Sequence, residues 1–195
     1  MTTRSTNGIG QNKDIISVVF ATAFLLMLPL VAMQFTDDVV WGLFDFIVAG
    51  TLLVGTGLTY VLVARKAGNM AYRSAVGVAL AAALFLVWAN LAVGLIGSEN
   101  EPANLMYLGV LAVGIIGAVI SRLQPLGMAL TLFAMALAQA LVAVIALVAG
   151  MDQYPESSVA EIVYVNGFFV ALFVGSALLF RVASGTDSNR DRRLA

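Results

Sequence analysis

Long apolar runs alternate with short polar segments along the whole chain. A helix needs about 20 apolar residues, within a range of about 17–25, to cross the hydrocarbon core of a bilayer. The pattern predicts six transmembrane helices, at residues 15–35, 39–64, 74–97, 105–121, 126–150 and 162–183. The polar segments 1–14 and 184–195 are predicted to be short disordered tails, the second of them basic. We therefore predict an all-α integral membrane protein with a single six-helix domain, residues 15–183.

The composition supports a protein whose solvent is lipid. Hydrophobic residues make up 61% of the chain and charged residues 11%, against about 25% charged residues in soluble domains; the mean hydropathy is +0.98. The chain contains no cysteine and no histidine, which excludes thiolate nucleophiles, zinc sites of sulfur or imidazole ligands, and histidine-ligated haem. The composition does not exclude a metal site made of oxygen ligands. No acid–base pair, cofactor motif or nucleic-acid patch is found, so a non-enzymatic role without a cofactor is favoured.

The basic residues predict the orientation of the six helices. The Lys and Arg residues, 10 in total, all fall on one side of the predicted six-helix arrangement: Arg4, Lys13, Arg65, Lys66, Arg73, Arg122, Arg181, Arg190, Arg192 and Arg193. The three loops on the other side carry only acidic charges. By the positive-inside rule both termini are cytoplasmic. The general composition is that of small bacterial proteins, so we expect a multi-pass protein of a bacterial-type inner (cytoplasmic) membrane; no motif set resembles a particular family.

The second, fourth and sixth predicted helices share a pattern. They can be aligned on a Val-Gly pair and each ends at an arginine, which gives the matched residues Gly55, Gly114, Gly175, Arg65, Arg122 and Arg181. The near-constant spacing predicts three helical hairpins of similar structure, with these glycines at close helix contacts. The competing explanation is that Leu, Val and Gly-rich helices align by chance.

Amide and carboxylate side chains recur in the outer part of the predicted helices. An ionised carboxylate there is costly, about 2.5–3.5 kcal/mol at the helix centre and less near the interface, so it should face the bundle or water. We expect Asp45, Asn90, Asn104 and Asn166 to line an outward-facing polar crevice. The alternative is that the asparagines only bond helix to helix and that Asp45 stays wet near the membrane surface.

The segment "SENEPAN", residues 98–104, lies between two of the apolar runs. It has the features of a capped turn, with Gly97 before it and Pro102 at the start of the next helix. In the crevice hypothesis it also covers the polar site, and Glu99 and Glu101 raise the local cation concentration at the mouth.

Two functional classes follow. The first is a transporter or channel-like protein that binds a cation or a small polar solute in the crevice. The second is a non-catalytic accessory or assembly subunit of a larger membrane complex, in which the polar residues are structural. The expected partners are the lipid bilayer in both cases, the solute or cation in the first, and other membrane subunits or further copies of the chain in the second.

Overall fold

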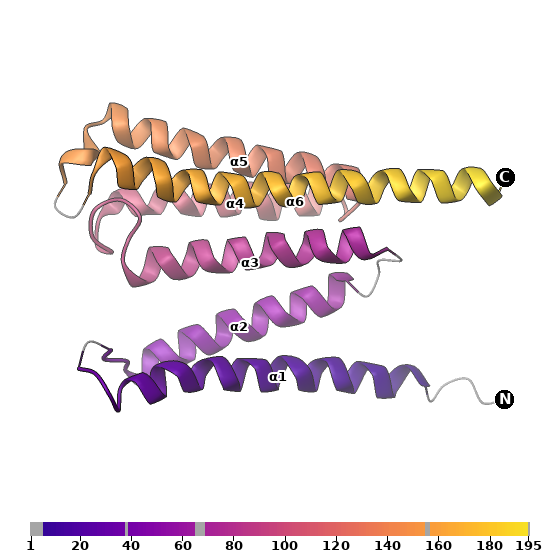
Figure 1. Cartoon of the computed structure of the whole chain (residues 1–195), viewed down its shortest axis with the longest axis horizontal. Coiled ribbons are helices and arrows are strands. Elements are labelled where there is room, and N and C mark those ends of the chain that lie inside the picture. Colours follow the sequence, from indigo (N-terminus) through magenta and orange to yellow (C-terminus); the bar gives the residue numbers. More distant parts are fainter. Residues whose placement is uncertain (1–5, 38, 65–68, 155–156, 195) are drawn as a thin grey trace. The chain divides into compact units, whose positions relative to one another are not determined.

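The computed structural model describes residues 6–37, 39–64, 69–154 and 157–194, and this part of the chain is helical without strands (Figure 1). Side chains are described between Lys13 and Thr186 within those ranges. The long helices are α1 (Thr6–Ala32), α2 (Leu43–Ala64), α3 (Met70–Ala92), α4 (Met106–Ile120), α5 (Pro125–Val148) and α6 (Val159–Leu194). Two short 3₁₀ turns, η1 (Pro102–Leu105) and η2 (Met151–Gln153), follow α3 and α5.

The all-helical fold class and the number of apolar helices are confirmed. Six helices are long and apolar enough to cross a membrane. Large apolar side chains point outward along them, for example Ile116 and Val148, which are 57% and 84% exposed. Such surfaces are unfavourable in water and suit lipid contact, so the chain has the features of a polytopic membrane protein.

Several helix boundaries differ from the sequence-based ones. α1 begins at Thr6 and α6 continues to Leu194, so much of the two segments predicted to be disordered is helical. No proline interrupts either segment, so the helical hydrogen bonds of the neighbouring span continue into it. α3 ends at Ala92 rather than at Gly97, because Gly94 and Gly97 adopt positive φ values of 73° and 64°.

The chain forms two compact units, residues 1–65 and 66–195. Unit 1 contains the α1–α2 hairpin. Its helices approach closely at Gly57, where an added Cβ would lie 2.6 Å from Cγ1 of Val18. Gly57, a small residue at the crossing point, thus permits the contact between the two helices. Thr22 of α1 is also buried in this unit.

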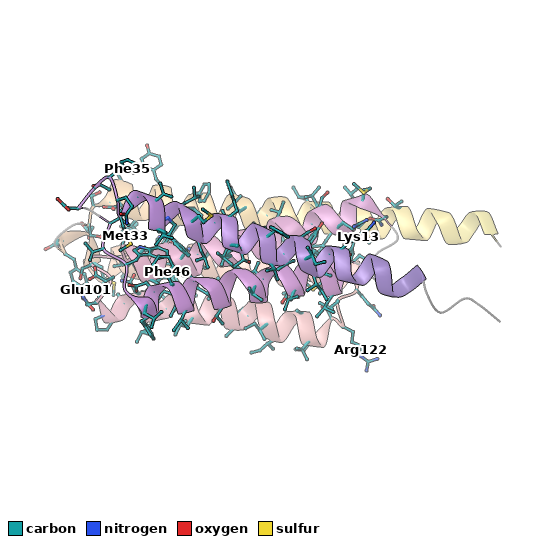
Figure 2. All side chains as sticks on the ribbon, turned by 90° about the horizontal axis from the view of Figure 1, so that it is seen from below. Lys13, Met33, Phe35, Phe46, Glu101 and Arg122 are labelled. Atoms are coloured by element: carbon teal, nitrogen blue, oxygen red, sulfur yellow. The ribbon has the colours of Figure 1, made fainter. Side chains whose placement is uncertain are left out.

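Unit 2 contains the other four long helices. α6 packs against both α3 and α5, and α5 packs against α4, whereas α3 and α4 touch little. The hydroxyl of Ser176 on α6 donates to the carbonyl of Ala75 on α3 at 2.9 Å. On the other side, Gly114 of α4 faces the side chain of Met135 on α5. Figure 2 shows Glu101 and Arg122 at opposite ends of this unit, in keeping with the separation of acidic and basic loops in the sequence.

The glycines of the proposed repeat are not equivalent. An added Cβ at Gly114 would lie 2.7 Å from Sδ of Met135, but at Gly55 and Gly175 it would meet no described atom within 4 Å. The predicted close contact is therefore wrong at Gly175, and Gly55 makes none within its own unit. In addition, α5 and α6 pack along their length while α3 and α4 do not. The shared Val-Gly pair does not determine which face of each helix meets a neighbour.

Candidate functional site

Asn104 organises the loop that follows α3. It lies on η1 and is 3% exposed. Its Oδ1 accepts hydrogen bonds from the backbone N–H groups of Leu95 and Ile96, both at 3.0 Å. Its Nδ2 donates to the carbonyl oxygens of Ile96 and Ser98 at 3.2 and 2.8 Å. One side chain thus satisfies four backbone groups of this loop, as buried polar groups require.

The turn interpretation of residues 98–104 is confirmed in its main features. Gly97 has a left-handed conformation and Pro102 is the first residue of η1. Glu101 stands at the N-cap position of η1, although its side chain makes no capping hydrogen bond. The tight path also needs Gly94, where an added Cβ would lie 2.6 Å from the backbone carbonyl of Ser98.

The side chain of Asn90, near the end of α3, bonds to the same segment. Its Nδ2 donates to the backbone carbonyl of Asn104 at 3.4 Å. Its Oδ1 is buried and has no hydrogen-bond partner in the described part of the chain. The structure therefore brings Asn90 and Asn104 together, as expected, and leaves one amide oxygen available.

A second polar group lies between α4, α5 and α6. Oδ1 of Asn166 accepts hydrogen bonds from Nε2 of Gln139 at 2.9 Å and from the hydroxyl of Tyr107 at 3.2 Å. Nδ2 of Asn166 donates to the carbonyl of Ile162 at 2.8 Å. The three side chains are at most 1% exposed. Oε1 of Gln139 is the second buried side-chain oxygen that has no partner among the described residues.

These two groups form what we call the polar layer: Asn90, Asn104, Tyr107, Gln139 and Asn166. Asn104 and Tyr107 are three residues apart on the continuous η1–α4 segment, which links the two groups within about one helical turn. The layer draws one or more polar side chains from each of α3, η1–α4, α5 and α6. It is uncharged, and it lies toward the end of unit 2 that carries the acidic loops.

Tyr107 and Gln139 were not among the predicted site residues. Tyr107 resembles an interfacial aromatic residue in the sequence, but its spacing from Asn104 places both on neighbouring positions of one helical segment. Gln139 lies in the interior of a predicted helix, whereas Gln34, the other glutamine within the predicted helices, is next to a helix end. The signal in the sequence that could have identified Gln139 is a neutral amide surrounded by aliphatic residues.

The predicted acidic residues make local contacts of their own. Asp45 belongs to unit 1, is exposed, and stands in the first turn of α2, nearer the start of its helix than the predicted boundary at residue 39 placed it. Its Oδ2 accepts a hydrogen bond from the backbone N–H of Gly42 at 2.7 Å, which is the reciprocal half of a capping box. Glu99 is exposed and accepts a hydrogen bond from Asn100. Glu101 is half-buried, with its Cγ beside Gly97.

No group of three or more Asp, Glu, His or Cys residues suited to a metal ion occurs among the residues searched, namely those the structure describes. Comparison of the chain with protein-family models, with curated proteins and with solved structures gave no match.

Proposed function

We propose that the chain is a transporter or channel-like protein of a bacterial-type inner membrane, with a binding site for a small polar solute or cation in the polar layer. The observation that supports this proposal is the pair of unpartnered buried acceptors, Oδ1 of Asn90 and Oε1 of Gln139. A buried acceptor without a donor costs about 1–3 kcal/mol. A bound molecule that offers N–H or O–H groups, or a bound cation, would remove this cost.

The chemistry of the layer limits the solute. All its groups are neutral amides or a phenol, so a divalent cation would lose its hydration without a compensating charge. A monovalent cation or a small neutral hydrogen-bond donor fits better. Glu99 and Glu101, at the same end of unit 2, favour cations electrostatically.

A second candidate is the non-catalytic subunit of a larger membrane complex. Both amide atoms of Asn104 and of Asn166 already bond to protein groups, which is the usual role of amides between membrane helices. In addition, Gly167 and Gly175 on α6 have no described neighbour within 4 Å of an added Cβ. With Ala171 between them, they form a row of small residues that another helix, from a further copy or another subunit, can approach.

Thermal unfolding of the purified protein separates the two candidates. A ligand that binds the folded state at 100 times its Kd stabilises it by about 2.7 kcal/mol. If the layer is a binding site, sodium, potassium, ammonium or urea at low concentration should raise the unfolding temperature. Gln139→Leu or Asn90→Leu should remove the response, while Asn100→Ala in the exposed turn should keep it. A wild-type protein that responds to none of these probes would favour the subunit role.

We also propose that Asp45 is a cation ligand in unit 1. Asp45→Asn retains the acceptor that caps α2 but removes the charge. If Asp45 holds a cation, this variant should lose cation-dependent stabilisation, and Asp37→Asn, in the preceding exposed segment, should not. Asp38, the other loop carboxylate, lies outside the described residues. Equal behaviour of the two variants would remove Asp45 from the site.

The proposed orientation has a separate test, helped by the absence of native cysteines. Single cysteines at Ser98 and Ser157 should react with a membrane-impermeant thiol reagent on intact cells. A cysteine at Ser188 should react only after the cells are broken. Labelling of the Ser188→Cys variant in intact cells would contradict a cytoplasmic C-terminus.

A further inference from the structure

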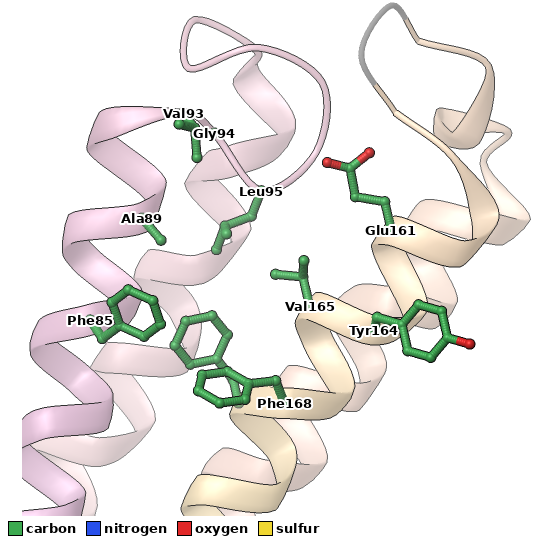
Figure 3. Close-up of a pocket in the computed structure, with 10 residues that line it drawn as sticks. Phe85, Ala89, Val93, Gly94, Leu95, Glu161, Tyr164, Val165 and Phe168 are labelled. Carbon is green, nitrogen blue, oxygen red and sulfur yellow. The ribbon is translucent and has the colours of Figure 1, made fainter. Parts of the chain in front are cut away.

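A groove lies between α3 and α6 at the acidic end of unit 2 (Figure 3). Its volume is about 340 Å³, near the lower end of the ~300–1,000 Å³ typical of small-molecule sites. Ala89 and Leu95 line it from the side of α3, and Val165 lines it from α6. Phe85 and Phe169, with ring centroids 5.6 Å apart, close its deeper part. The walls are therefore almost entirely apolar.

Glu161 gives the groove a charged mouth. It is exposed and occupies the first turn of α6, where its backbone N–H donates to Oγ of Ser158 at 3.2 Å. In a full capping box its carboxylate would turn back to the helix start. Instead, Figure 3 shows the carboxylate directed from α6 toward the segment of Leu95, above the apolar walls. Neither of the loop segments 93–105 and 149–158 contains a Lys or Arg that could supply the opposite charge.

We propose that this groove holds one acyl chain of a phospholipid whose headgroup carries a primary ammonium group, and that the ammonium group pairs with Glu161. The inference goes beyond the proposed function and does not depend on it.

The first argument is the position of the groove along the helices. Glu161 and Phe169 are eight residues apart on one helix, which is ~12 Å at 1.5 Å per residue. The groove thus runs from the end of an apolar span into its interior, as an acyl chain runs from its headgroup into the hydrocarbon core. Methylene groups of that chain would cover Ala89, Leu95 and Val165, whose contact with a polar ligand would be unfavourable.

The second argument is charge complementarity. The carboxylate of Glu161 attracts an ammonium group and repels an anionic headgroup. A primary ammonium has N–H donors for a charge-assisted hydrogen bond, whereas a quaternary ammonium has none. The site should therefore prefer phosphatidylethanolamine to phosphatidylcholine, and both to phosphatidylglycerol.

The test uses the full-length protein, purified in detergent and stripped of lipid. Each sample contains micelles with one of the three phospholipids, at the same mole fraction. The unfolding temperatures of the protein in the three samples are then compared. Phosphatidylethanolamine should raise the unfolding temperature by at least about 3 °C more than phosphatidylglycerol. Glu161→Gln, which keeps the size of the side chain, should abolish that preference. Asp152→Asn, an acidic position on η2 at the same end of the unit but outside the groove, should leave it unchanged.

A second variant tests the apolar part of the groove. Ala89→Phe should fill the space and reduce stabilisation by all three lipids; if this variant does not fold, the Glu161→Gln comparison still decides. No difference between phosphatidylethanolamine and phosphatidylglycerol in the wild type would overturn the proposal, as would an equal loss of preference in Asp152→Asn. A fluorophore on Ala89→Cys that brominated lipid cannot quench would also overturn it, because protein would then cover the groove.

Discussion

Asn104→Leu is expected to be among the most destabilising single substitutions in the chain. The backbone N–H groups of Leu95 and Ile96, which now donate to Oδ1 of Asn104 at 3.0 Å, would lose their acceptor. Leu95 and Ile96 are 7% and 0% exposed, so water cannot readily replace it. At about 1–3 kcal/mol for each unsatisfied buried group, the expected loss is roughly 2–6 kcal/mol. Thermal unfolding in detergent should show this loss as a fall of about 2–4 °C for each kcal/mol.

The matched control is Asn100→Leu, since Asn100 is exposed and its side chain has the neighbouring Glu99 as its one hydrogen-bond partner among the described residues. It should change the unfolding temperature by about 2 °C or less. Hydrogen exchange adds a local measurement: the amides of Leu95 and Ile96 should exchange faster in Asn104→Leu and at the wild-type rate in Asn100→Leu. Similar unfolding temperatures for the two variants would show that the bonds of Asn104 do not stabilise the fold.

The sequence was sufficient to predict the helices because their main requirement is an unbroken apolar run. It was also sufficient for the turn after α3, where Gly97 and Pro102 restrict the backbone in known ways. The start of α2 was misplaced for a specific reason. The apolar run begins at Val39, but the helix begins at Leu43, where the bond from the N–H of Gly42 to Asp45 fixes its first turn. Asp45, which caps the start of α2, was therefore interpreted as a residue further inside the helix.

The partners of the polar side chains were harder to predict. A helix that is apolar on all sides has no hydrophobic face from which its rotation can be read. This is the case for α5 and α6, so the sequence does not indicate that Gln139 and Asn166 point toward each other. The same limit explains the glycines of the aligned helices within unit 2, where Gly114 meets a neighbouring helix and Gly175 meets no described atom.

Asn166→Leu is the second substitution for which we expect a large effect. It would leave Nε2 of Gln139 and the hydroxyl of Tyr107 without the acceptor that they share. Bonds between membrane helices are worth about 0.6 kcal/mol on average and up to about 1.7, and a stranded buried group costs about 1–3 kcal/mol. We therefore expect a loss of about 1–3 kcal/mol, measured as a fall in the unfolding temperature.

The combination with Gln139→Leu gives the sharper result. Gln139→Leu alone removes a donor but also removes the unpartnered Oε1, so in the absence of ligand it should be close to neutral. The double variant leaves only the hydroxyl of Tyr107 without its acceptor, and should be more stable than Asn166→Leu alone. Coupling of at least about 0.5 kcal/mol is expected for residues in contact. Strictly additive losses would mean that the 2.9 Å bond between these two side chains does not contribute to the stability of the bundle.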